Sequence, residues 1–118
     1  MATQFQGSAI IRLNGKEWPS DNDGTLTPGG KERETVKGSR VYGFSEKPTE
    51  AMVECTVFNC AETDVMELQN ITNATVEFET DIGQVYLLPG AWTVETGTLS
   101  ADGKIKLKMA SIECKRVQ

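Results

Sequence analysis

The sequence has 118 residues and a net charge of −5, from 12 basic and 17 acidic side chains. This length fits a single domain, and an acidic domain is a poor candidate for gripping the phosphates of nucleic acid. The chain contains no histidine, so it lacks the commonest general base and metal ligand, which disfavours an enzyme. No apolar run approaches the ~20 residues of a membrane helix, so we expect no contact with a membrane.

The first twenty residues predict an N-terminal arm followed by a hairpin. Residues 1–7 are short and polar, and we expect an extended arm. Residues 8–13 form the first expected strand and 16–18 the second. Between them, Asn14-Gly15 is a strong hairpin signal, because both positions tolerate a positive φ.

The stretch from residue 20 to 48 predicts a long loop. It is rich in glycine, proline and charged residues, and no helical or strand period is sustained along it. Only residues 36–44 have the composition of a short strand. A loop of this length in a compact domain is usually functional. We therefore expect this loop to meet a partner.

The rest of the chain predicts strands and one short helix. The helix is expected after Asp64, which with Glu67 has the outline of a capping box, and Asn70 or Asn73 would end it in a left-handed conformation. Pro89-Gly90 is expected to break a strand. The expected strands are 51–58, 74–80, 84–88, 91–96 and 104–109, with an extended edge over 111–117. The sum of seven or eight strands predicts a mainly β fold, a small β-sandwich or barrel with one short flanking α-helix, as a single domain over residues 1–118.

The sequence offers no catalytic constellation, and we predict no cofactor and no metal site. Glu77 and Glu79 share a strand face without an apolar pocket around them. The Asp21-x-Asp23-Gly24 run lacks the glutamate that closes a twelve-residue calcium loop. The Pro28–Lys31 run lacks the spacing of a phosphate-binding loop.

Three cysteines are too few, and odd in number, for a disulfide framework. A reducing compartment fits them better. Cys55 lies in an apolar strand pattern and is expected in the core. Cys60 and Cys114 have no role that the sequence suggests.

Several blocks of the sequence, taken in order, carry a family resemblance. They are Leu26-Thr27-Pro28-Gly29-Gly30 with Arg33, Val41-Tyr42-Gly43-Phe44-Ser45-Glu46, Asp64-Val65-Met66-Glu67-Leu68-Gln69-Asn70-Ile71, Ala74-Thr75-Val76, Gly83-Gln84-Val85-Tyr86 and Ala91-Trp92. With these blocks the chain resembles the tail tube proteins of Mu-like contractile-tailed bacteriophages, from about residue 7 to 118.

The resemblance implies a structural virion protein and no enzymatic activity. Six copies would form a ring, and rings would stack into the hollow tail tube through which phage DNA passes into the host. The implied partners are other copies of the chain, the tail sheath protein, and the baseplate and tape-measure proteins. DNA would pass through the lumen without specific binding. The implied location is the phage tail of the virion, after assembly in the host cytoplasm.

Within this interpretation two groups of residues are candidate sites. Thr75, Glu77 and Glu79 alternate with apolar residues and would face the lumen, where acidic side chains repel DNA. The same row would otherwise face the sheath or a neighbouring subunit. The candidate contact between rings lies in the long loop and comprises Pro28, Gly29, Gly30, Lys31 and Arg33.

Two other functions stay open at this point. One is a monomeric β-barrel module that binds a small ligand or a peptide, with an apolar pocket near Trp92 and Tyr86. The other is an enzyme that uses carboxylates, which would need a pocket that raises the pKa of one of them.

Overall fold

A computed structural model of the chain describes residues 2–118, so that Met1, the first residue of the expected arm, lies outside the described part. It contains ten strands and one helix within this part. The strands are β1 (Ala9–Leu13), β2 (Lys16–Trp18), β3 (Thr25–Thr27), β4 (Gly30–Lys37), β5 (Val41–Thr49), β6 (Ala51–Phe58), β7 (Ala74–Thr80), β8 (Val85–Leu99), β9 (Lys104–Ser111) and β10 (Lys115–Arg116), and the helix is α1 (Val65–Gln69).

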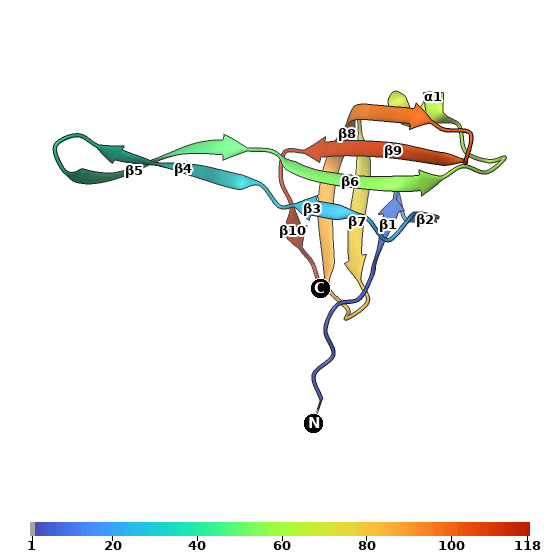
Figure 1. Cartoon of the computed structure of the whole chain (residues 1–118), viewed down its shortest axis with the longest axis horizontal. Coiled ribbons are helices and arrows are strands. Elements are labelled where there is room, and N and C mark those ends of the chain that lie inside the picture. Colours follow the sequence, from blue (N-terminus) through green and yellow to red (C-terminus); the bar gives the residue numbers. More distant parts are fainter. Residues whose placement is uncertain (1) are drawn as a thin grey trace.

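Most strands belong to one antiparallel path that folds into two layers (Figure 1). Its order is β2-β1-β7-β8-β9-β6-β3, with β10 beside β8. The layer with β7 and the layer with β6 and β9 run in different directions, and β8 belongs to both. The path ends at β2 and β3 and does not close on itself. The prediction of a mainly β, sandwich-like fold with one short helix is confirmed, whereas the sheet is not a closed barrel.

Alternating apolar residues explain how the two layers meet. On β7, Ala74, Val76 and Phe78 are buried and the residues between them are half-buried. The facing strands β6 and β9 present their own buried rows, comprising Ala51, Val53, Cys55 and Val57 on one and Ile105, Leu107 and Met109 on the other. The core therefore lies between the layers, and the predicted core position of Cys55 is confirmed.

Strand β8 corrects the expectation that Pro89-Gly90 ends a strand. The strand continues from Val85 to Leu99. Gly90 adopts a φ of 61°, and the pairing with β7 shifts its register before Ala91. The hydroxyl of the buried Ser111 donates to the carbonyl of Pro89 at 2.6 Å. The glycine bends the strand, and this bend lets one strand serve both layers.

The helix follows the prediction in place but differs at its ends. The Asp64 side chain accepts a hydrogen bond from the backbone N–H of Met66 at 3.0 Å, which is an N-cap bond. The helix ends at Asn70 with a φ of −94°, so the expected left-handed end is wrong at that residue. Only Leu68 of the helix is fully buried, since the helix rests one face on the sheet. No helix within residues 2–118 is long and apolar enough to cross a membrane.

The prediction of a long loop over residues 20–48 is wrong. The segment contains β3 and nearly all of β4 and β5, which pair with each other as a separate two-stranded sheet. The short strand considered over residues 36–44 spans the turn between β4 and β5. Every residue of β4 is exposed, so no apolar alternation marks the strand in the sequence.

Candidate assembly interface

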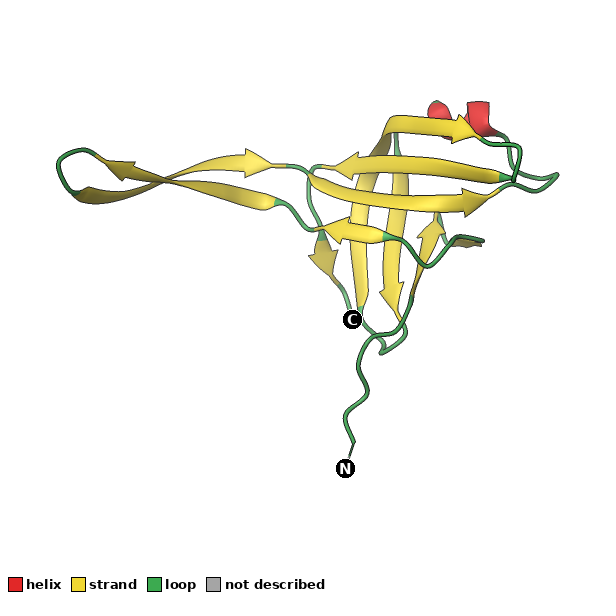
Figure 2. Ribbon diagram, in the orientation of Figure 1, coloured by secondary structure: helices red, strands yellow, loops and turns green. Residues whose placement is uncertain are grey.

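The most prominent feature outside the sandwich is the hairpin of β4 and β5, which we call the projecting hairpin (residues 30–49). It extends away from the two layers along the longest dimension of the molecule (Figure 2). Its strands pair continuously from Gly30 with Thr49 to Val36 with Gly43. All of its residues are exposed except Thr49, which is half-buried. A two-stranded sheet that covers neither face is marginally stable by itself, so this hairpin is a candidate for contact with another molecule.

The register gives the projecting hairpin two different faces. Arg33 pairs with Glu46, and Thr35 pairs with Phe44, so these four residues lie on one face. The guanidinium of Arg33 lies 5.5 Å from the centre of the Phe44 ring. On the same face, Lys31 Nζ lies 3.8 Å from a Glu46 carboxylate oxygen.

The opposite face of the projecting hairpin carries more acid. Glu32 pairs with Lys47, and Glu34 pairs with Ser45. The two glutamates face one lysine there. The hairpin therefore offers a basic, aromatic face and a weakly acidic one.

Apolar side chains gather near the turn of the projecting hairpin. Val41 is 69% exposed, Tyr42 63%, Phe44 61% and Val36 45%. Contiguous apolar side chains on a soluble protein mark interaction sites. The end of the hairpin is therefore a stronger candidate for a contact than its base.

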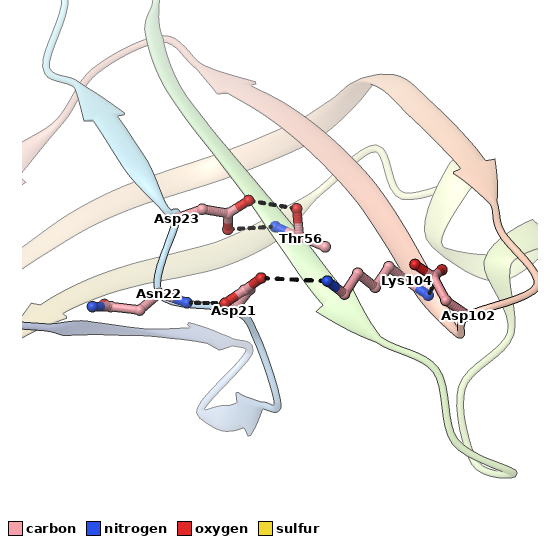
Figure 3. Close-up of polar contacts among 6 residues, drawn as sticks. All are labelled: Asp21, Asn22, Asp23, Thr56, Asp102 and Lys104. Atoms are coloured by element: carbon pink, nitrogen blue, oxygen red, sulfur yellow. Dashed lines mark hydrogen bonds and ion pairs between the residues drawn. The ribbon is translucent and has the colours of Figure 1, made fainter.

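The side chains of Asp21 and Asp23 fix the segment before β3 to β6 and β9 of the sandwich (Figure 3). One oxygen of the Asp23 carboxylate accepts from the hydroxyl of Thr56 at 2.6 Å, and the other accepts from the backbone N–H of Thr56 at 3.2 Å. The neighbouring Asp21 lies 3.9 Å from Lys104 Nζ. The backbone N–H of Asp21 also donates to the carbonyl of Thr56 at 2.8 Å. These bonds hold the chain along β6 just before β3 begins.

Gly29 constrains the base of the projecting hairpin itself. It adopts a φ of 72°, and a Cβ there would lie 2.6 Å from the carbonyl carbon and oxygen of Glu50. Only glycine fits here, because the segments that enter and leave the hairpin approach each other closely. The next residue, Gly30, also has a positive φ but open space around it.

The structure places the five residues predicted for a contact between rings in three settings. Pro28 is an exposed linker, and the two glycines shape the base. Lys31 and Arg33 lie together on the basic face. Sequence reasoning did not single out Tyr42 and Phe44 as site residues, although aromatic residues at i and i+2 are typical of strands.

The row predicted for the lumen has the alternation that the sequence indicated. Thr75, Glu77 and Glu79 are half-buried on the outer side of β7, opposite the core row. Arg12 on β1 forms an ion pair with Glu79. The row is therefore less acidic than its sequence suggested, since Arg12 balances one of the two glutamates.

The thiols differ in their environment. Burial, and to a lesser degree the Asp23 carboxylate, raises the pKa of Cys55 to about 12. Burial also raises the pKa of Cys114. The hydroxyl of Thr63 lies 3.2 Å from the exposed sulfur of Cys60, and this hydrogen bond lowers the pKa of Cys60. Within residues 2–118, no group of three or more cysteine, aspartate and glutamate side chains is arranged to hold a metal ion.

Comparison with known proteins shows the family of the chain. Residues 2–116 match the family described as phage tail tube protein. The chain belongs to the phage tail tube protein family. It is 39% identical over 114 residues to the tail tube protein of Escherichia phage Mu, covering 97% of this chain and 96% of that protein. As a family member it is a structural protein of the phage tail and not an enzyme.

Two cryo-EM structures of contractile injection systems share the fold of this tail tube protein. One is the tube-terminating cap of the anti-feeding prophage, with a TM-score of 0.61, 8% identity, and coverage of 98% of this chain and 93% of that one. The other is the sheath/tube terminator of an extracellular contractile injection system, PVC, with a TM-score of 0.63, 8% identity, and coverage of 99% and 100%. At this identity they show the shared fold alone.

Proposed function

We propose that six copies of this tail tube protein form a ring and that rings stack into the hollow tail tube through which phage DNA passes. The observation that carries the proposal is the projecting hairpin, which is paired along its length yet exposes both faces and four large apolar side chains. The proposed partner is a second copy of the chain, because a tail tube is built from many copies of the same protein. The base of the hairpin, including Lys31 and Arg33, would contact the adjacent ring.

The open ends of the sheet also favour assembly. The path ends at β2 and at β3, each of three residues. Unpaired strand edges attract further strands, and natural sheets cover them or keep them short. In a ring, edges of neighbouring copies would face each other, so that a continuous sheet lines the lumen.

For the lumen itself we propose the row of Thr75, Glu77 and Glu79. A ring of six chains, each with a net charge of −5, is strongly negative. Negative walls repel phosphates, so DNA would slide through without specific binding. The register places the half-buried Ile10 and Val85 beside Glu79. These apolar neighbours favour the alternative, in which the row faces the sheath or a neighbouring subunit, and density for an assembled tube would decide between the two.

The further partners in this proposal are the tail sheath outside the tube and the baseplate and tape-measure proteins at assembly. Assembly would take place in the host cytoplasm, before the tail joins the virion. The family of the chain supports these partners.

Negative-stain electron microscopy of the purified chain over a concentration series tests the proposal. We expect six-fold rings with a central hole, and stacked tubes at higher concentration. Sedimentation velocity on the same samples gives the mass of the rings. A chain that remains monomeric over the whole series would contradict the proposal and favour the monomeric binding module.

A further inference from the structure

The end of the projecting hairpin combines apolar surface with positive charge. Between residues 35 and 45 the only charged residues are Lys37 and Arg40, and there is no acid. The guanidinium of Arg40 lies 5.5 Å from the centre of the Tyr42 ring. Tyrosine and arginine are enriched where binding energy concentrates in protein interfaces. We call residues 36–44 the hairpin end.

A groove with the opposite character lies between the β1–β2 turn and α1, and we call it the acidic groove. It has a volume of about 600 Å³, within the range of pockets that enclose a small ligand. Its floor is apolar. Leu13 and Leu68 are buried there, and Trp18 and Ile71 are half-buried.

The rim of the acidic groove carries four exposed carboxylates, from Glu17, Glu62, Asp64 and Glu67. Lys16 is the one basic residue that lines it. The rim therefore has an excess of three negative charges, against two positive charges on the hairpin end. Charges of opposite sign on two surfaces steer them together and set their register.

The two surfaces lie at opposite ends of the molecule, so they cannot meet within one copy (Figure 1). The chain measures 61 × 45 × 24 Å. The hairpin end marks one extreme of the long axis, and β2 and α1, which border the groove, lie toward the other. A contact between unlike patches at opposite ends repeats from copy to copy, and it builds rings if it closes and filaments if it does not.

We propose that the hairpin end of one copy docks in the acidic groove of the next copy. The proposal rests on the proposed self-assembly and names the contact that carries it. Tyr42 would enter the groove above Trp18 and Leu68, while Lys37 and Arg40 meet the carboxylates of the rim. Eight residues of β4 at ~3.3 Å each give the hairpin a reach of about 26 Å beyond the sandwich.

The native Cys60 provides a direct test, because it is exposed and lines the acidic groove. Ser39 lies in the turn of the hairpin end and is exposed. A Ser39→Cys variant of the full chain, oxidised under assembly conditions, should form disulfides between copies, since a disulfide requires the two Cα atoms within ~7 Å. Each copy would insert its hairpin end into one neighbour and bind the hairpin end of another neighbour in its own groove. We therefore expect a ladder of multiples of 12.9 kDa on a non-reducing gel.

Two matched variants complete the cross-linking test. Adding Cys60→Ser to Ser39→Cys should abolish the ladder and leave at most a dimer that joins two hairpin turns. Ser45→Cys places the same thiol on the acidic face of the hairpin, and its cross-linking to Cys60 should be at least ~10-fold slower. A ladder that persists without Cys60, or the absence of a ladder, overturns the proposed docking.

Charge reversal tests the same contact without thiols. Glu62→Lys with Glu67→Lys should weaken assembly by at least ~10-fold in concentration, and so should Lys37→Glu with Arg40→Glu, because like charges then meet. Mixing the two reversed chains restores opposite charges at every contact, so the mixture should assemble near the wild-type concentration. Failure of the mixture to recover overturns the docking proposal. If the mixture does not recover but the wild-type chain still forms rings or tubes, the docking proposal is wrong and the proposed function is retained.

Discussion

Replacing Asp23 by alanine should lower the stability of the chain measurably, because this carboxylate ties the segment before β3 to the sandwich. It accepts two hydrogen bonds from Thr56, at 2.6 Å from the hydroxyl and 3.2 Å from the backbone N–H. Thr56 is only 6% exposed, so its donors would lose their partner in a poorly hydrated place. Asp23 itself is exposed, so in the alanine variant water would replace part of the hydrogen bonding that its carboxylate provides to Thr56. We therefore estimate a loss of about 1.5–2 kcal/mol in the free energy of unfolding.

Asp21 supplies the matched control two residues away. Its ion pair with Lys104 is 3.9 Å long, and the two side chains are 46% and 47% exposed. Such a pair contributes little, so Asp21→Ala should cost about 0.5 kcal/mol. The backbone bond from Asp21 to Thr56 remains in this variant.

Thermal denaturation followed by circular dichroism measures the difference, at concentrations too low for assembly, since association would raise the apparent stability. For 118 residues the entropy of unfolding is about 0.25 kcal/mol/K, so Asp23→Ala should lower Tm by about 6–8 °C and Asp21→Ala by about 2 °C. A double-mutant cycle of Asp23→Ala with Thr56→Val should give a coupling of about 1 kcal/mol. Equal melting temperatures for the Asp23 and Asp21 variants would refute this account of the contact between Asp23 and Thr56.

Other changes test the base, the groove and the thiols. Gly29→Ala should destabilise the chain by about 2–3 kcal/mol in urea titration, because the new Cβ would lie 2.6 Å from the Glu50 backbone. Gly30 also has a positive φ but open space around it, so Gly30→Ala should cost only about 1 kcal/mol. Equal losses for the two variants would contradict the close contact at Gly29. Leu68→Ala removes a side chain that is 2% exposed and should cost 2–5 kcal/mol by the same titration, and a smaller loss would show that α1 is not anchored there. Burial raises the pKa of Cys55 to about 12, so the unfolded chain loses this proton first and stability should fall as the pH rises above ~9; Cys55→Val should flatten that fall. Iodoacetamide should modify Cys60, whose pKa is lowered, long before Cys55 at neutral pH, and equal rates measured by mass spectrometry would contradict the buried position of Cys55.

The sequence predicted the sandwich well because its strands have one buried face. The alternation along β7 identified both its core row and its outward row. Asn14-Gly15 marked the turn between β1 and β2, where both residues have a positive φ. These signals are local, and burial of one face enforces them. The prediction that Pro89-Gly90 ends a strand was wrong. Proline and glycine end most strands, but in β8 they bend one strand that serves both layers.

The projecting hairpin was missed for the opposite reason. Its strands bury neither face within one chain, so the sequence has no period that a single copy requires. The alternation it does have is one of charge, with Lys31 and Arg33 on one face and Glu32 and Glu34 on the other. The acidic groove was equally hidden, since Trp18 and Leu68 come together only through the tertiary fold.

An ordered hairpin changes the energetics expected for assembly. A mobile loop would lose conformational entropy when it meets a neighbour, at about 1–2 kcal/mol for each residue that becomes fixed. The pairing of β4 with β5 and the close contact at Gly29 restrict that backbone before any contact forms. Docking then orders mainly the side chains of the hairpin end, so a modest surface suffices for association. Variants that loosen the base, such as Gly29→Ala, should therefore weaken assembly even though they leave every side chain of the hairpin end in place.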